Sequence, residues 1–123
     1  MTIFYCQYNG HFVAVSINWT PERTVTVFDS LCIAFQDRNL TGFLTRFLKD
    51  NPGFQVKSSP FIIQDPTSHL CSVHCLAFLA SQSLKYGEPF QNFYRRFQRD
   101  DLLKNDQVSL NYVLRFITIC SQQ

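Results

Sequence analysis

Two short segments near the N-terminus alternate apolar and polar residues, as strands with one buried face do. They are residues 11–17, "HFVAVSI", and residues 24–30, "TVTVFDS", and both are rich in β-branched side chains. The segment between them, "NWTPER", is composed largely of residues that favour turns. The pattern therefore predicts an antiparallel hairpin.

A helical spacing of apolar residues follows the hairpin and ends at the helix-breaking segment 51–53, "NPG". Its apolar positions are Leu40, Phe43, Leu44, Phe47 and Leu48. The next segment, "FQVKSSPFII", indicates one or two strands that are interrupted at Pro60.

Three further helices are expected in the C-terminal half. The first covers "CSVHCLAFLASQSLKYG" and ends at Gly87. A short helix is expected from Pro89 to about Arg99, and a last one from Asp106 to about Ile119. The buried face expected for the first of them consists of Val73, Leu76, Ala77, Ala80 and Leu84. This order of strands and helices predicts a single α+β domain over residues 1–123.

Size and composition agree with one compact domain. The chain has 123 residues, of which 46% are hydrophobic, and thirteen are phenylalanines, so an aromatic core is expected. The net charge of +2 is too small to indicate nucleic-acid binding. A local basic group is better explained by a solvated helix face than by a phosphate site, and its members are Arg95, Arg96, Arg99 and Lys104.

The cysteines and the N-terminus indicate a reducing location. The five cysteines, at positions 6, 32, 71, 75 and 120, are odd in number and scattered, which is more typical of free thiols than of a disulfide framework. The first ten residues, "MTIFYCQYNG", lack the pattern of a signal peptide, and no apolar run approaches the length of a membrane span. We therefore expect an intracellular protein without membrane partners.

Strand parity places a histidine and an acid together. Residues 11, 13, 15 and 17 share one face of the first strand, and residues 25, 27 and 29 share one face of the second. If the valines of the two strands pack together, His11 and Asp29 lie on the same face near the open end of the hairpin. A one-residue slip in register would separate them, and a surface histidine beside a strand-end aspartate is the simpler alternative.

Cys71 lies at the start of a predicted helix, where free backbone N–H groups and the helix dipole stabilise a thiolate. An imidazole with an orienting carboxylate, such as His11 with Asp29, would activate that thiol. Gln64, just before the turn at Asp65-Pro66, could donate its side-chain amide to an oxyanion. These four residues are the candidate base, orienting acid, oxyanion donor and nucleophile.

Other roles for the neighbouring residues stay open. The segment "CSVHC" offers Cys71, His74 and Cys75 as zinc ligands, although no second Cys/His pair accompanies it. Cys75 is interpreted as a small buried residue. His69 is an alternative base, but it lies in the turn beside the nucleophile and lacks an evident carboxylate partner. No cofactor or metal is expected.

The order His, acid, Gln and Cys resembles the adenovirus-type cysteine endopeptidases and, more distantly, the proteases specific for ubiquitin-like proteins. "GHFVAVSINW" and "TVFDSL" look like the family's His and acid strands, and "QDPTSHLC" looks like its Gln-x-Pro-x-Ser-x-x-Cys segment. The seven-residue spacing between Gln64 and Cys71 resembles the Gln-to-Cys spacing of the adenovirus branch. The resemblance covers roughly residues 8 to 117. The chain differs in having Ser72 after the nucleophile, where the family normally has glycine, and Phe12 after the base, where it usually has tryptophan.

The resemblance implies a papain-like fold of the adenovirus-protease type, with a small antiparallel or mixed central sheet packed with helices. N-terminal elements of the family are then reduced or missing. It also implies hydrolysis of peptide bonds in viral precursor polypeptides, commonly after glycine, a location in the virion and the host nucleus or cytoplasm, and a possible peptide or DNA activator. A protease for ubiquitin-like modifiers and an inactive relative that only binds its partner are the alternatives.

Overall fold

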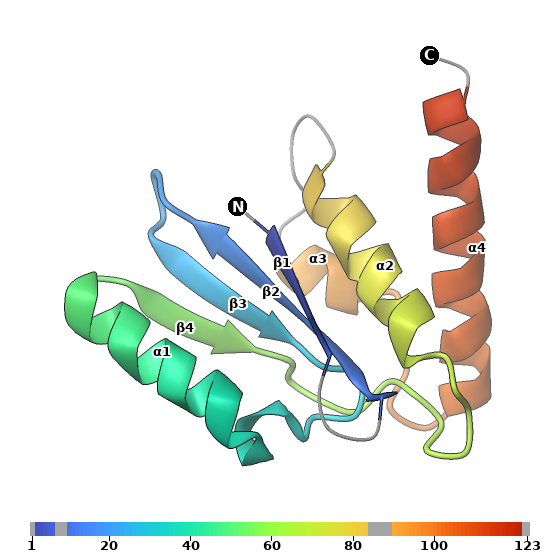
Figure 1. The fold of residues 1–123 in the computed structure, drawn as a ribbon. Coiled ribbons are helices and arrows are strands. Elements are labelled where there is room, and N and C mark those ends of the chain that lie inside the picture. The colour runs from blue at the N-terminus through green and yellow to red at the C-terminus, as the bar shows by residue number, and fades with distance from the viewer. Residues whose placement is uncertain (1, 7–9, 84–89, 122–123) are drawn as a thin grey trace.

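The computed structural model describes residues 2–6, 10–83 and 90–121, and it consists of one sheet with helices on both faces (Figure 1). The strand order is β1-β2-β3-β4; β1 and β3 are antiparallel to β2, and β4 is parallel to β3. The strands are β1 (Thr2–Cys6), β2 (Phe12–Asn18), β3 (Thr24–Phe28) and β4 (Gln55–Ser58). The helices are η2 (Ala34–Gln36), α1 (Arg38–Asp50), α2 (Cys71–Ser83), α3 (Phe90–Tyr94) and α4 (Leu102–Ser121). The predicted α+β class is confirmed.

The predicted hairpin is formed by β2 and β3. Val15 lies opposite Val27 and Ile17 opposite Val25, so the valines of the two strands share a face as expected. The segment "FQVKSSPFII" contributes only β4, which ends before Pro60. Strand β1 was not predicted, because "TIFYC" shows no regular alternation of apolar and polar residues. This segment becomes a strand by pairing with the edge of β2.

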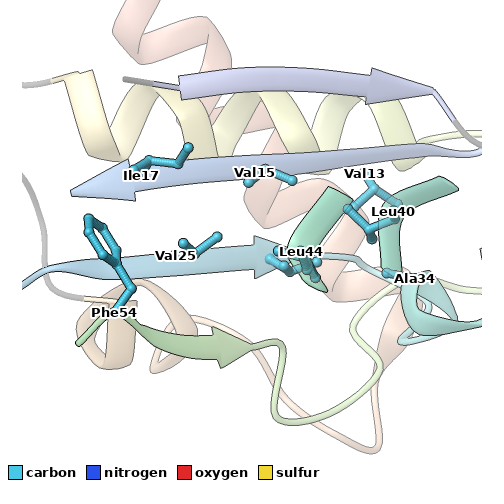
Figure 2. Close-up of a cluster of buried hydrophobic side chains, with 9 residues drawn as sticks. Val13, Val15, Ile17, Val25, Ala34, Leu40, Leu44 and Phe54 are labelled. Atoms are coloured by element: carbon cyan, nitrogen blue, oxygen red, sulfur yellow. The ribbon is translucent and has the colours of Figure 1, made fainter. Parts of the chain in front are cut away.

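One face of the sheet is covered by α1, as the helical spacing predicts. The side chain of Asp37 accepts hydrogen bonds from the N–H groups of Asn39 and Leu40, at 2.7 and 3.2 Å, and so caps the helix start. The apolar face of α1 packs on alternate residues of β2 and β3 (Figure 2). The buried residues of this layer are Val13, Val15, Ile17, Val25, Val27, Ala34, Leu40, Leu44 and Phe54.

The opposite face is covered by α2, α3 and α4 (Figure 1). Its core is aromatic, as the phenylalanine content predicts. The rings of Phe28 and Phe78 stack with centroids 4.9 Å apart, and Phe93 meets them edge-on at 5.7 and 5.9 Å. Helix α2 is therefore held between the sheet and α4, and its first residue lies at the end of the sheet where the candidate site is located.

The buried face predicted for α2 is confirmed at Ala77 and Ala80 and is wrong at Leu76. Leu76 is 46% exposed, whereas His74, Phe78 and Ser81 are each 0% exposed. Helix α2 contacts both the sheet and α4. Its buried surface is therefore wider than a single apolar stripe and includes polar side chains, such as His74, that form hydrogen bonds with α4. The predicted end at Gly87, together with Leu84 and Pro89, lies outside the described residues.

Helix α3 ends, and helix α4 begins, at residues other than those that the apolar spacing predicts. Helix α3 ends at Tyr94 rather than near Arg99, because the buried Asn105 side chain binds the backbone of Gln98, accepting from its N–H at 2.8 Å and donating to its carbonyl oxygen at 2.5 Å. Helix α4 starts before Asp106 because the side chain of Asp101 accepts from the Lys104 N–H at 3.1 Å and caps the helix. Among the described residues, no helix combines the length and apolar character needed to cross a membrane.

Candidate active site

The His11 imidazole and the Asp29 carboxylate meet at the end of the hairpin, each one residue beyond its strand. Nε2 of His11 lies 2.5 Å from Oδ1 of Asp29, and the two side chains are 11% and 2% exposed. The register explains this contact, because the pairing of Val15 with Val27 continues toward Asp29 while His11 extends past the last paired residue. The predicted juxtaposition of imidazole and carboxylate is confirmed.

The turn after β3 folds around the Asp29 carboxylate. Its oxygens accept hydrogen bonds from the backbone N–H groups of Leu31 at 2.9 Å and Ile33 at 2.7 Å. The N–H of Cys32 donates to the Asp29 carbonyl oxygen at 3.2 Å, and Cys32 closes the turn with a φ of 57°. The orientation of the carboxylate is thus fixed by the backbone, so it can in turn fix the orientation of the imidazole.

Cys71 is the first residue of α2, as predicted. The carbonyl oxygen of Leu70 accepts from the His74 N–H at 3.0 Å, which makes Cys71 part of the first helical turn. N–H groups of that turn lack an intrahelical acceptor, and with the helix dipole they favour a negative charge. The Cys71 side chain is 9% exposed and borders a pocket. The Cys71 thiol therefore lies at a helix N-terminus and faces a pocket that could hold a ligand.

Both neighbours of His11 contact α2. The Phe12 N–H donates to Sγ of Cys71 at 3.5 Å, and the same sulfur lies 3.9 Å from the carbonyl oxygen of Gly10. Sγ of Cys75, one turn further along, lies 3.3 Å from the Phe12 carbonyl oxygen. Burial, and next the charge of Cys71, raise the pKa of the Cys75 thiol, so Cys75 stays protonated and donates to Phe12. These contacts hold His11 at the same pocket as Cys71.

The Gln64 side chain is 2% exposed, and hydrogen bonds fix both ends of its amide. Oε1 accepts from the Ser30 hydroxyl at 2.5 Å, and Nε2 donates to the Ser68 carbonyl oxygen at 3.0 Å. An amide nitrogen carries two hydrogens, of which Ser68 accepts one. Gln64 borders the same pocket as Cys71, and its role as an oxyanion donor stays a prediction.

The pocket has a volume of about 220 Å³ and collects residues from four parts of the chain. These parts are the start of β2, the turn after β3, the segment before α2 and the first turn of α2. Asp29 reaches the pocket through His11. The residues that line it are Gly10, His11, Phe12, Leu31, Gln64, Ser68, His69, Cys71 and Ser72.

The other two histidines differ in their surroundings. His69 is exposed and borders the pocket, so it stays an alternative base. His74 is 0% exposed, with Nε2 2.7 Å from Oδ1 of Asp106 and Nδ1 2.7 Å from Oγ of Ser109. Burial lowers the pKa of His74, and its hydrogen bond to Asp106 partly opposes that effect. His74 therefore links α2 to α4.

Zinc ligation through "CSVHC" has no structural support in the described part of the chain. Both ring nitrogens of His74 are engaged with residues of α4, and Cys75 contacts Phe12. The described residues contain no group of three or more His, Cys, Asp or Glu side chains that is placed to hold a metal ion.

Two serines that support the site were not identified from the sequence. Ser30 fixes the Gln64 amide, and Ser59 accepts from the Asp29 N–H at 2.8 Å. Ser30 follows Asp29, so strand parity would have placed it on the opposite face. Ser59 reaches Asp29 through the parallel pairing of β3 with β4, which has no short-range signal in the sequence.

No family model, curated protein or solved structure matches this chain.

Proposed function

We propose that this chain is a cysteine endopeptidase of the adenovirus-protease type, with a papain-like fold, that cleaves viral precursor polypeptides during virion maturation. The observation that carries the proposal is that the His11–Asp29 pair and the Cys71 thiol converge on one pocket. Gln64, a buried amide held in a fixed orientation, borders the same pocket. Base, orienting acid, nucleophile and oxyanion donor are the parts that acyl transfer through a thiol requires.

The reaction follows from which ring nitrogen is engaged. Because Nε2 of His11 contacts Asp29, Nδ1 is the nitrogen that takes the proton of the Cys71 thiol. The thiolate attacks the scissile carbonyl carbon, and the displaced electron pair forms an oxyanion near the Gln64 amide and the first-turn N–H groups of α2. Collapse of this intermediate breaks the C–N bond, and the imidazolium gives its proton to the leaving amine. A water molecule that His11 deprotonates then hydrolyses the thioester and restores the thiol.

The resemblance also implies the setting in which this reaction takes place. Its substrates are precursor polypeptides of a virus, and the protein acts in the virion and in the host nucleus or cytoplasm. A peptide or DNA activator is a further partner that the resemblance implies.

Ser72 favours a second candidate, an inactive relative that binds its partner without cleaving it. Ser72 borders the pocket directly after the nucleophile, where the family normally has glycine. A side chain at this position reduces the space beside the first-turn N–H groups that an oxyanion would approach.

Mass spectrometry of peptide mixtures incubated with the purified chain separates these functions. We expect cleavage that Cys71→Ala abolishes and that Cys32→Ala, a matched change of an exposed cysteine, preserves. Cleavage restricted to fusions of ubiquitin-like modifiers would instead assign the chain to the modifier proteases. No cleavage by a folded chain whose Cys71 resists electrophilic peptide aldehydes would favour the binding candidate.

A further inference from the structure

Ser72 directly follows the candidate nucleophile and borders the same pocket. Its side chain is half-buried, and within the described part of the chain no residue forms a hydrogen bond with its hydroxyl. Ser81, later in the same helix, instead donates to the Phe78 carbonyl oxygen at 2.6 Å, which is the usual behaviour of a serine in a helix. The Ser72 hydroxyl is therefore available to a ligand in the pocket.

The start of α2 explains why Ser72 has no such acceptor. The carbonyl oxygen four residues before it belongs to Ser68, which lies outside the helix. That oxygen accepts from Nε2 of Gln64 at 3.0 Å. The acceptor that a helical serine normally uses is thus part of the contact that orients Gln64.

The direction of the side chain brings the hydroxyl to the part of the pocket where an oxyanion would form. In a helix, every Cα–Cβ bond tilts toward the helix N-terminus. Because Ser72 is the second residue of α2, its side chain is directed toward the start of the helix. The Cys71 thiol and the N–H groups without an intrahelical acceptor are located there. A hydroxyl can rotate its hydrogen toward a nearby acceptor.

We propose that Ser72 is a further catalytic residue, whose hydroxyl donates a hydrogen bond to the oxyanion that forms when the Cys71 thiolate attacks a carbonyl carbon. This inference rests on the proposed function, and it adds a third donor to the Gln64 amide and the backbone N–H groups. The carbonyl oxygen becomes negative only as the C–S bond forms. The hydroxyl therefore stabilises the transition state more than the bound substrate.

The proposal and simple crowding of the pocket by Ser72 predict opposite results for one substitution. If the side chain only occupied space, Ser72→Gly would accelerate the reaction. If the hydroxyl donates to the oxyanion, Ser72→Gly removes a donor and slows the reaction. Ser72→Ala keeps Cβ and removes only the hydroxyl, so it should slow the reaction as well.

Two reagents that attack the same sulfur test the hydroxyl without a known substrate. A peptide aldehyde that ends in glycinal adds the Cys71 thiol across its C=O bond, so that a C–S bond forms and the carbonyl oxygen takes the proton. The oxygen of this hemithioacetal occupies the position of the oxyanion. Iodoacetamide alkylates Cys71 with loss of iodide and forms no such oxygen. A donor to the oxyanion therefore affects the first reaction and not the second.

We expect Ser72→Ala and Ser72→Gly each to raise the dissociation constant of the aldehyde by about tenfold to a hundredfold, less than for most fixed donors because a hydroxyl rotates. The rate of Cys71 alkylation should stay nearly unchanged. For any peptide that the unaltered chain cleaves, kcat should fall by a similar factor with KM nearly unchanged. Ser121→Ala changes an exposed serine at the end of α4 and is the matched control, which should behave like the unaltered chain.

Far-UV circular dichroism establishes that each variant is folded, and Ser72→Ala alone provides the test if Ser72→Gly proves unstable. The proposal is overturned if Ser72→Ala binds the aldehyde as tightly as the unaltered chain, or if Ser72→Gly binds it more tightly. A parallel fall in the alkylation rate also overturns it, because the hydroxyl would then act on the thiol or on the local structure. These outcomes differ from a failure of the proposed function, in which the unaltered chain neither cleaves peptides nor binds the aldehyde and both proposals are overturned.

Discussion

Replacing His74 by alanine should destabilise the fold by about 3–5 kcal/mol, because the change leaves a cavity and two buried polar groups without their hydrogen-bond partner. The reason is the environment of Asp106, which is 6% exposed and lies 2.7 Å from the imidazole that the change removes. The hydroxyl of Ser109, 0% exposed, loses its partner as well. Each buried group left unsatisfied costs about 1–3 kcal/mol, and the cavity adds to that.

The same histidine should make stability depend on pH. Burial lowers the pKa of His74 in the folded state, whereas an unfolded chain protonates it near an ordinary value of about 6.5. The contribution of His74 to the free energy of unfolding is therefore complete above pH about 6.5 and decreases as the pH falls below that value. The slope is about 1.4 kcal/mol per pH unit until His74 is protonated in the folded state as well.

Urea unfolding at a series of pH values between about 8 and about 5 measures both effects. His74→Gln should lose the part of the pH dependence that belongs to this imidazole. The difference between the stability curves of the unaltered chain and of His74→Gln, plotted against pH, measures that part. His69→Ala, a change of an exposed histidine, is the matched control and should leave the curve nearly unchanged. Two results would refute the role of His74 as a buried link between α2 and α4. One is a loss of less than about 1 kcal/mol in the free energy of unfolding of His74→Ala, and the other is an unaltered pH slope in His74→Gln.

The remaining predictions concern catalysis. Cys71→Ala and His11→Ala should each abolish peptide hydrolysis with the fold intact, and the double variant should be scarcely worse, since the two act as a unit; substantial turnover in Cys71→Ala would end the assignment. Asp29→Asn should lower kcat/KM less than His11→Ala, because a thiolate–imidazolium pair depends less on its third member; equal losses would give Asp29 more than an orienting role. Gln64→Ala should lower kcat about a hundredfold to a thousandfold, because an oxyanion donor acts mainly in the transition state. KM and the alkylation rate of Cys71 should stay nearly unchanged. A parallel fall in the alkylation rate would show that Gln64 supports the local structure instead. Ser30→Ala, which removes the hydroxyl that fixes Gln64, should lower kcat by about tenfold, and an unchanged kcat would show that this contact is dispensable.

The parts of the site that the sequence predicts depend on local periodicity. The meeting of His11 with Asp29 follows from the parity of two adjacent strands, and the helix start at Cys71 follows from the turn before it. Both are short-range properties, because a hairpin fixes its own register once its valines share a face.

The parts that the sequence does not predict depend on contacts between distant segments. The amide of Gln64 is fixed by Ser30, 34 residues away, and the Phe12 backbone by Cys75, 63 residues away. The buried arc of α2 was missed for the same reason: His74 is buried only because α4 supplies Asp106 and Ser109. No periodicity within one segment encodes such pairings.

Competition between Cys71 and Cys32 for limiting iodoacetamide is the most direct test of the proposed active site. Exposure alone predicts that Cys32 reacts first, since it is exposed whereas Cys71 is 9% exposed. Although Cys32 as a whole is exposed, its sulfur packs against the carbonyl oxygens of Asp29 and Ser59. Desolvation of the thiol, and next the nearby charge of Asp29, raise the pKa of Cys32 and slow its reaction. We predict that peptide mapping at neutral pH finds Cys71 modified first, and that His11→Ala lowers the rate of modification at Cys71. Faster modification of Cys32 in the unaltered chain, or a Cys71 rate that does not depend on His11, would contradict the proposal that Cys71 is an activated nucleophile.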